Sequence, residues 1–475
     1  MCAVLVTTGT LSGVPAGAAP VMWVPPVSPP VQDSCPATGP ALRYVVLFEP
    51  GTAASTATDE VTAACGSVTA YYREIAVGVV TSPAPVLLER LGRDRIYSAA
   101  AEAGPVDAET GVAAPDTSAS RDVDTADRSA EQWDMAMTGA ARANAVEPGS
   151  RDVTVGVLDS GIDPAHPDLV HALDRSRSAG CLNGAPDRSP QAWMPTASTH
   201  GTHVAGTIAA ADDGRGITGV APGVRLASVK VVDDEGFIYP ENAVCGFMWA
   251  ARQGIDITNN SYFVDPWLLT CADQPGQQVA HEAVRRAVAH ATGSAVLSVA
   301  ATGNAGLNLA DPVTDRRSPD NVARPAARAV DDECDVLPAE LPGVTTVSAV
   351  GAKGVRAGYS SYGADVVDVA GPGGDRSQPT GASSSGCVLS TIPGGYGYAC
   401  GTSMASPHAA GVAALLASRH PGSGPAELAE LLASQADPLA CPAAGGSTPD
   451  AGCDGDAADS FYGQGLVDAM AAVTR

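Results

Sequence analysis

The chain has few positively charged residues and few aromatic ones. Lysine occurs only at Lys230 and Lys353, and 27 lysines and arginines stand against 52 aspartates and glutamates, for a formal net charge of −25. This charge argues against a nucleic-acid partner and against an acidic membrane surface, because both are themselves negative. We interpret it as a solubility feature rather than as a device for binding basic substrates.

Long apolar runs are also missing. After the N-terminus no stretch reaches the ~18 continuous apolar residues of a membrane span, so we expect no membrane anchor. Residues 1–19 are apolar and small, and Ala16-Gly17-Ala18 resembles a signal-peptidase site, although no Lys or Arg precedes Arg43. We interpret 1–19 as a signal peptide whose true start lies upstream; the alternative is an apolar, disordered N-terminus. Residues 20–40, rich in Pro, Ser and Val, are typical of a linker.

The chain has eleven cysteines but no C-x-x-C pair, which argues against a zinc site. If Cys2 leaves with the signal peptide, ten cysteines remain, and this even number favours disulfides in an oxidising compartment. The local pairs Cys387–Cys400 and Cys441–Cys453 are the favoured bridges. The other pairings stay open.

Two regions differ in pattern. The first, 41–107, predicts a small α+β unit in the order strand, helix, strand, strand, helix: 42–48, 54–65, 67–73, 76–81 and 86–91. The polar, acidic residues 108–130 then predict an exposed, cleavable linker.

From residue 131 onward, β-branched runs alternate with helical stretches, which indicates a parallel sheet covered on both faces. The expected strands are 153–158, 226–232, 255–259, 295–300, 344–350 and 366–369. The expected helices are 200–210, 240–252, 277–291, 403–418, 425–434 and 464–473.

An acidic residue and a histidine lie at the end of a predicted strand and at the start of a predicted helix, positions where catalytic residues are often found. Asp159 ends a buried parallel strand, where such sheets place their sites; the alternative is an aspartate that caps a turn. His200 begins a helix of small residues, and a neutral imidazole suits a general base. His203 suggests a metal pair with His200, but H-E-x-x-H is absent, so we interpret His203 as a core or supporting residue.

A serine lies at the start of a later helix, in Gly401-Thr402-Ser403. A serine there is beside free backbone N–H groups, which favour negative charge on a nearby oxygen; the alternative is a plain N-cap. A serine hydroxyl is a weak nucleophile unless a base takes its proton, and a buried carboxylate holds that base in one tautomer. Asp159, His200 and Ser403 fit these roles, and Asn304 offers an amide that could bind an oxyanion.

These segments resemble the subtilisin-like serine proteases, or subtilases. The likeness covers three blocks in the family's order, with shorter matches at 300–306 and 462–469: Val157–Leu169, His200–Pro222 and Gly401–Leu416. It implies an α/β fold over residues 131–475, a three-layer sandwich around a mostly parallel seven-stranded sheet. It also implies that Asp159 orients the base His200, that Ser403 is the nucleophile, and that Asn304 donates to the oxyanion beside the N–H of Ser403.

The resemblance also concerns the early unit and a metal. Residues 41–107 would be an inhibitory propeptide, which assists folding and occupies the cleft until autocleavage between Ala100 and Glu131. The family often binds structural calcium, for which Asp168 and the acidic loop 211–217 stand in the expected places; the alternative is a plain acidic loop. The expected calcium ligands are Asp168, Asp213 and the backbone carbonyls of Ala211, Arg215 and Ile217, with Gln132 as a further candidate.

One segment departs from the family. Ser261, Tyr262 and Phe263 match a wall of the substrate groove, where the family usually has a small aliphatic residue and then glycine. We expect these three residues and Gly303 to bind substrate, although Phe263 could instead turn into the core.

The sequence therefore predicts a secreted, extracellular, calcium-stabilised serine endopeptidase, made as a zymogen and acting as a monomer on proteins or peptides. Its activity should rise as pH climbs through the pKa of His200, near ~6.5 if unperturbed. One rival is a dedicated maturation protease with a single partner substrate. The other is a peptide-binding pseudoprotease.

Overall fold

A computed structural model describes residues 35, 40–83, 86–102, 126–311, 314–380, 385–441 and 458–475. The chain divides into two units, residues 1–36 and 37–475, and the following account concerns the second. The expected signal peptide 1–19, most of the expected linkers 20–40 and 108–130, and Cys453 lie outside the described residues.

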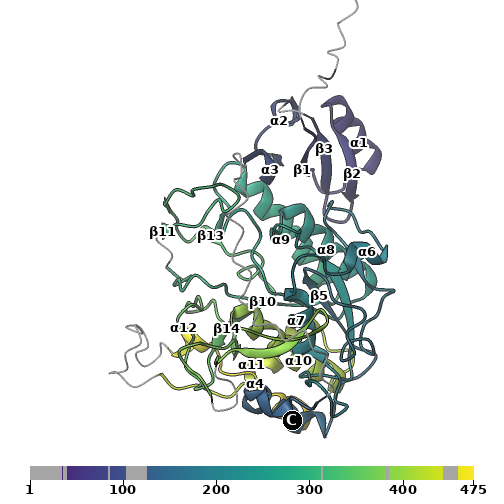
Figure 1. The fold of residues 1–475 in the computed structure, drawn as a ribbon. Coiled ribbons are helices and arrows are strands. Elements are labelled where there is room, and N and C mark those ends of the chain that lie inside the picture. Colours follow the sequence, from purple (N-terminus) through teal and green to yellow (C-terminus); the bar gives the residue numbers. More distant parts are fainter. Residues whose placement is uncertain are drawn as a thin grey trace, which may run out of the picture. The chain divides into compact units, whose positions relative to one another are not determined.

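A seven-stranded sheet forms the centre of this second unit (Figure 1). Its strands, in order across the sheet, are β15 (Val369–Pro372), β14 (Val344–Val350), β10 (Leu297–Ala301), β8 (Ile257–Asn260), β5 (Thr154–Asp159), β7 (Arg225–Lys230) and β6 (Ala179–Gly180). Every neighbouring pair runs parallel, as predicted. Because β5 comes first in the chain but lies between β8 and β7, the strand order reverses at β5. Open parallel sheets form a ligand crevice at the carboxyl ends of the strands where the order reverses.

Helices cover both faces of this sheet, and each face has its own apolar core. On one face, α7 (His200–Ala209), α10 (Thr402–Arg419), α11 (Pro425–Ser434) and α13 (Ala469–Thr474) pack with Val155 and Val157 of β5. On the other face, α8 (Pro240–Gln253) and α9 (Gln277–Gly293) pack with Leu158. Successive strand side chains point to opposite faces, so one apolar strand serves two cores. The predicted three-layer α/β sandwich is confirmed.

Shorter elements complete the domain. The short helices are η1 (Ser129–Glu131), α4 (Trp133–Met137), α5 (Ala140–Asn144), α6 (Pro190–Trp193) and α12 (Ala458–Tyr462). The two-stranded pairs are β11 (Thr314–Asp315) with β12 (Arg328–Ala329), β9 (Thr270–Cys271) with β13 (Cys334–Asp335), and β16 (Val388–Ile392) with β17 (Gly395–Ala399).

Two predicted elements are shifted toward the C-terminus. The strand expected at 366–369 starts only at Val369, because the residues before it form a turn in which Asp365 has a φ of 60°. The helix expected at 464–473 starts only at Ala469. The preceding Leu466 is held in bridges to Ala370 of β15 and to Asp437, and the side chain of Asp468 caps the helix by accepting from two backbone N–H groups.

The early unit is a four-stranded antiparallel sheet with helices, one strand more than the three that the sequence predicts. The sheet order is β2 (Ser67–Tyr72), β3 (Val77–Ser82), β1 (Leu42–Leu47) and β4 (Ile96–Tyr97), and the helices are α1 (Ala54–Ala63), α2 (Val86–Leu91) and α3 (Ala99–Glu102). Along β1, Tyr44 and Val46 enter the core of this unit, whereas Val45 between them enters the core that contains α8 and α9. The outer face of the small sheet is therefore buried against the main domain.

Polar contacts also join the early unit to the main domain. They use side chains of the early unit as well as its backbone carbonyls. These hydrogen bonds run from Arg43 to the carbonyl of Leu182 (2.8 Å), from Tyr72 to that of Gly184 (2.7 Å), and from Arg286 to those of Phe48 and Ile75 (3.1 and 3.2 Å).

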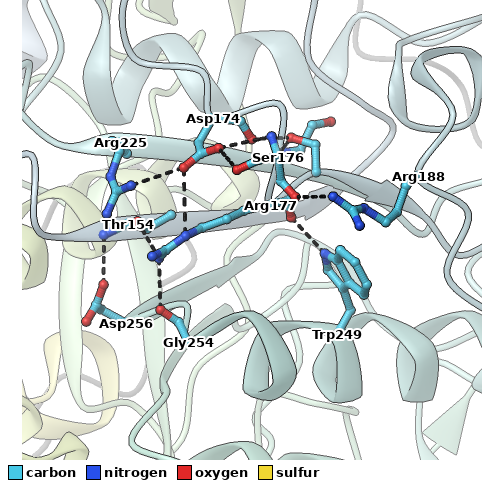
Figure 2. A network of polar contacts seen from close by, with 11 residues as sticks. Thr154, Asp174, Ser176, Arg177, Arg188, Arg225, Trp249, Gly254 and Asp256 are labelled. Carbon is cyan, nitrogen blue, oxygen red and sulfur yellow. Dashed lines mark hydrogen bonds and ion pairs between the residues drawn. The ribbon is translucent and has the colours of Figure 1, made fainter.

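A charged network ties together the amino ends of the central strands (Figure 2). The Asp174 carboxylate pairs with Arg225 at the start of β7 (3.1 Å) and with Arg177 (3.7 Å). Arg177 also donates to the Thr154 hydroxyl at the start of β5 (3.0 Å), and Asp256 accepts from the N–H of Thr154 (2.8 Å). The network holds the strand ends opposite to those that carry the predicted site, so we assign it a structural role.

Disulfides further cross-link the main domain. The predicted Cys387–Cys400 bridge is present, and Cys181–Cys245 and Cys271–Cys334 are two more. Cys35, Cys65 and Cys441 are disulfide-bonded as well. The pairing Cys441–Cys453 stays a prediction, because Cys453 lies outside the described residues. Across the described part of the chain, no helix combines the length and the apolarity that crossing a membrane would require.

Candidate active site

Asp159 and His200 form a hydrogen-bonded pair at the carboxyl end of β5. Nδ1 of His200 lies 2.8 and 2.9 Å from the two carboxylate oxygens of Asp159. The Asp159 side chain is 1% exposed and that of His200 is 18% exposed, so the acid is hidden while the imidazole can be reached. Gly201 makes this approach possible, since a Cβ there would lie 2.6 Å from the carbonyl oxygen of Gly161.

The pKa of His200 is raised above its ordinary value. Burial opposes the charged form, but the charge and the hydrogen bond of Asp159 together outweigh it. The carboxylate therefore stabilises the protonated imidazole and fixes Nδ1 as the donor, which leaves Nε2 to exchange protons.

His203 lies in the interior of the protein, as expected of a core or supporting residue. It is 1% exposed, and its Nε2 lies 3.3 and 3.1 Å from the carbonyl oxygens of Val388 and Gly397. Burial, and then the charge of His200, lower the pKa of His203 to about 3. The neutral ring of His203, bonded to two backbone carbonyls, therefore helps to pack α7 against the β16–β17 pair.

Ser403 is the second residue of α10 and contacts the end of β8. Its Oγ donates to the carbonyl oxygen of Ser261 (3.2 Å), and Oγ of Ser261 donates to the carbonyl oxygen of Ser403 (3.0 Å). Pro407 explains the second bond. In an α-helix the carbonyl of Ser403 would accept from the N–H of residue 407, and proline has none.

The strand register brings Ser403 to the same edge as Asp159 and His200. Leu158 of β5 lies opposite Asn260 of β8, so Asp159 and Ser261 follow side by side. Ser403 is bonded to Ser261, and the helices that begin at His200 and Thr402 pack against each other. The three residues of the predicted relay thus lie at the same carboxyl edge of the sheet. The Ser403 hydroxyl is turned to Ser261 rather than to His200.

Asn304 lies beside the start of α10, on the turn after β10. Its Oδ1 accepts from both the N–H and the Oγ of Thr402, each at 2.9 Å. Two donors on one atom settle the orientation of the amide, so its Nδ2 is the end left to donate. The preceding Gly303 has a φ of +95°, which favours glycine, and Asn304 is exposed.

The expected groove wall is arranged unevenly. Tyr262 is buried at 9% exposure, packs in the core with α8 and α9, and donates to the Oδ1 of Asn260 (3.2 Å). Phe263 is half-buried beside a smaller cluster that includes Leu269. Tyr262 therefore offers little surface to a substrate, and Phe263 is the more accessible of the two.

The expected calcium loop is held by internal hydrogen bonds. Asp168 is 3% exposed, and its Oδ2 accepts from the N–H of Ile217 (3.1 Å) and the hydroxyl of Tyr396 (2.9 Å). Burial raises the pKa of Asp168, and the charge of Asp213 adds to this. Asp213 is exposed and accepts from the N–H of Arg215 (3.0 Å).

The fit of this loop to calcium is partial. Two hydrogen-bond donors already face the buried carboxylate of Asp168, and the Gln132 amide is paired at both ends with the backbone of Thr218 (2.8 and 2.9 Å). Within the described ranges, no group of three or more His, Cys, Asp or Glu side chains could hold a metal ion. Any calcium here would depend on backbone carbonyls, among them those of Ala211, Arg215 and Ile217.

The roles of two residues at the site are not predicted from the sequence. Thr402 was treated only as part of a helix start, yet it fixes the amide of Asn304. Pro407, which the sequence analysis does not single out, lies inside α10 and frees the carbonyl of Ser403 for Ser261. A proline four residues after a serine in a helix is the sequence signal for the second contact. The first has no such signal, since it depends on tertiary structure.

Comparison with known proteins agrees with this geometry. A model of the subtilase family, Peptidase S8, matches residues 150–465. Subtilisin NAT of Bacillus subtilis subsp. natto is 33% identical over 324 residues, which cover 68% of this chain and 65% of that relative. A subtilisin of Bacillus pumilus is 32% identical, with 68% and 90% covered. The chain thus spans slightly less than two thirds of the first relative.

Solved structures share the fold. The epidermin leader peptide processing serine protease of Staphylococcus aureus has a TM-score of 0.69 at 20% identity, covering 91% of this chain and 98% of that one. A lanthipeptide protease has a TM-score of 0.55 at 26% identity, covering 72% and 93%. The first likeness covers more of the chain than residues 131–475 alone contain. From the family match and these relatives, the chain belongs to the subtilase family of serine peptidases.

Proposed function

We propose that the chain is a serine endopeptidase in which Asp159, His200 and Ser403 act as a catalytic triad. The observation that supports this proposal best is the hydrogen bond between the buried Asp159 carboxylate and the solvent-accessible ring of His200. His200 takes the proton of Ser403 as its Oγ attacks the scissile carbonyl, and an acyl-enzyme forms. Water then releases the acyl group with His200 again as base.

The hydroxyl of Ser403 must first leave the carbonyl of Ser261. A rotation about its Cα–Cβ bond turns it away, and catalytic hydrogen bonds often tighten only when substrate is bound. Nδ2 of Asn304 and the N–H of Ser403 then donate to the oxyanion. Ser261, Phe263 and Gly303 line the groove in this proposal, with Tyr262 supporting it from within.

The same proposal makes residues 41–107 an inhibitory propeptide and the chain a zymogen. Support comes from the buried outer face of its sheet and from hydrogen bonds to Gly184 and Arg286. Cleavage between Ala100 and Glu131 would separate it. The disulfides support secretion to an extracellular, oxidising compartment.

A serine-directed phosphonylating reagent tests the triad. It should label Ser403 in the mature enzyme, and it should fail to label the Ser403→Ala protein. Absence of label on a folded, processed enzyme would support a peptide-binding pseudoprotease instead.

A maturation protease with one partner substrate is the second candidate. The likeness to a lanthipeptide protease, 26% identical to this chain, and the accessible Phe263 in the expected groove wall favour it. Cleavage of a mixed peptide library separates the two, since the general protease should cut many sequences and the maturation protease one motif.

We also propose a structural calcium ion at the loop 211–217 with Asp168 and Asp213. The charge that Asp213 places near the buried Asp168 carboxylate supports it, because a bound cation would offset both negative charges. Calcium should then raise the Tm of the chain, and Asp213→Asn should reduce that rise. An equal rise in both proteins would exclude Asp213 as a ligand.

A further inference from the structure

Asp265 and Asp320 bring two buried carboxyl groups near each other, outside the sites described so far. Asp265, on the segment after β8, is 4% exposed, and the charge of Asp320 acts on its carboxyl group. Backbone contacts fix both residues: Asp265 accepts from the N–H of Ile238, and the N–H of Asp320 donates to the carbonyl of Pro266 (3.0 Å). The backbone of Asp320 is thus held beside the segment that carries Asp265.

Nothing positive balances this pair. In the described ranges, neither carboxyl forms an ion pair with an arginine or lysine. The nearby charges that act on them are those of Asp233 and Asp315, which are also acids, and Arg328 is committed to Asp315 (2.9 Å). Burial first, and then neighbouring acids, raise the pKa of Asp265 well above its ordinary range, and burial raises that of Asp320 to about 6.

Oxygen atoms without partners gather at the same place. Both carboxylate oxygens of Asp320 and the Oδ1 of Asn321 are buried and accept from no donor. Asn321 is 1% exposed, and its Nδ2 donates to the carbonyl of Ala99 in the early unit (3.0 Å). Asn321 and the charges of Asp233, Asp265 and Asp320 all act on the nearby Tyr239, whose pKa is raised, mainly by burial. The orphan amide oxygen thus shares the environment of the acid pair.

We propose that Asp265, Asp320 and Asn321 bind one divalent cation, with calcium the best match. All the unsatisfied atoms are oxygens, and hard cations take carboxylate and amide oxygens together with water. A bound cation supplies the charge that two buried carboxylates lack. It also fastens the segment around Asp320 to the segment after β8 and, through Asn321, to the end of the early unit at Ala99.

Calorimetric titration tests this site on the full-length chain. The Ser403→Ala background prevents self-digestion and leaves the proposed ligands intact. After removal of metal with EDTA, calcium chloride should bind with one equivalent that is absent in Asp320→Asn and in Asp265→Asn. Asp213→Asn is the matched control, since it alters the other calcium proposal and should keep this equivalent. Asn321→Ala should weaken the same equivalent by roughly tenfold or more.

Thermal unfolding gives a second test, because the difference in Tm between Asp320→Asn and its parent should differ between EDTA and calcium. In EDTA, Asp320→Asn should be at least as stable as its parent, because one of two like charges is gone. In calcium, the parent should gain roughly 5 °C or more and Asp320→Asn should not. Equal titrations of parent and variant would overturn the proposal in favour of two acids that share a proton. An equal loss of Tm in EDTA and in calcium would overturn it in favour of a hydrogen-bonding role.

Discussion

Ser261 and Ser403 exchange two hydrogen bonds, each hydroxyl donating to the carbonyl oxygen of the other residue, at 3.0 and 3.2 Å. One of these bonds exists because Pro407 leaves the carbonyl of Ser403 without its helical donor. The start of α10 is therefore joined to the end of β8 by side-chain hydrogen bonds. In a regular helix, a backbone N–H of the helix itself would bond the carbonyl of Ser403. This link sets where the Ser403 hydroxyl lies before substrate arrives.

A double-mutant cycle checks this link. Ser261→Ala leaves a carbonyl without a donor and should lower the free energy of unfolding by about 1–2 kcal/mol. In a Pro407→Ala chain, the new N–H can take over that carbonyl, so Ser261→Ala should then cost about 1 kcal/mol less. Denaturant unfolding in the Ser403→Ala background measures both, because the backbone carbonyl remains. Additive effects would show that Pro407 and Ser261 do not share that acceptor.

The pH profile should report the contact between Asp159 and His200. His200 must be neutral to act as base, and its pKa is raised by Asp159, so kcat/KM should rise with pH through a value above 6.5. Asp159→Asn should reduce kcat by about 10⁴-fold. The substitution should also move the acid limb of the pH profile to lower pH. Burial lowers the pKa of His200, and without the charge of Asp159 nothing offsets this effect. An unmoved acid limb would assign the titration to another group.

Oxyanion binding should depend on Asn304 and on the residue that holds it. Asn304→Leu should lower kcat by about 10²–10³-fold with little change in KM. Thr402→Val removes one of the two donors to Oδ1 and keeps the N–H, so its effect should be smaller, roughly tenfold. Steady-state kinetics on one peptide substrate compares the two. In the double variant, Thr402→Val should add almost nothing; a full additional loss would mean that Thr402 acts independently of Asn304.

Release of the early unit should depend on Arg286. Its Nη1 donates to the carbonyls of Phe48 and Ile75, so Arg286→Ala should shorten the delay between processing and full activity, by roughly tenfold for about 1.4 kcal/mol of lost binding. Arg285→Ala is the matched control, because Arg285 pairs with the same Glu282 but lies 45% exposed beside it. The same delay in both variants would remove Arg286 from the inhibitory contact.

Much of the fold follows from local patterns in the sequence. Buried strands such as 153–158 carry mostly apolar, β-branched runs. His200 and Ser403 each lie at the start of a helix whose small residues indicate close packing. The element boundaries at Val369 and Ala469 were less predictable, because a turn at Asp365 and a cap at Asp468 compete with the apolar pattern.

The rest depended on contacts between distant segments. Tyr262 lies in the segment predicted to form the groove wall, but its side chain turns inward. Its hydroxyl donates to the amide oxygen of Asn260, and its ring packs in the apolar core with α8 and α9. The Cys181–Cys245 and Cys271–Cys334 bridges join residues more than 60 apart, for which spacing offers no guide. The pair of Asp265 and Asp320 likewise appears only when two loops are brought together by the fold.

Intact mass and N-terminal sequencing of the wild-type protein beside Ser403→Ala tests the central claim most directly. If Ser403 is the nucleophile and 41–107 a self-cleaved propeptide, the wild type should begin between residues 100 and 131 while the variant keeps its early unit. Identical trimming of both proteins at that boundary would contradict self-processing by Ser403.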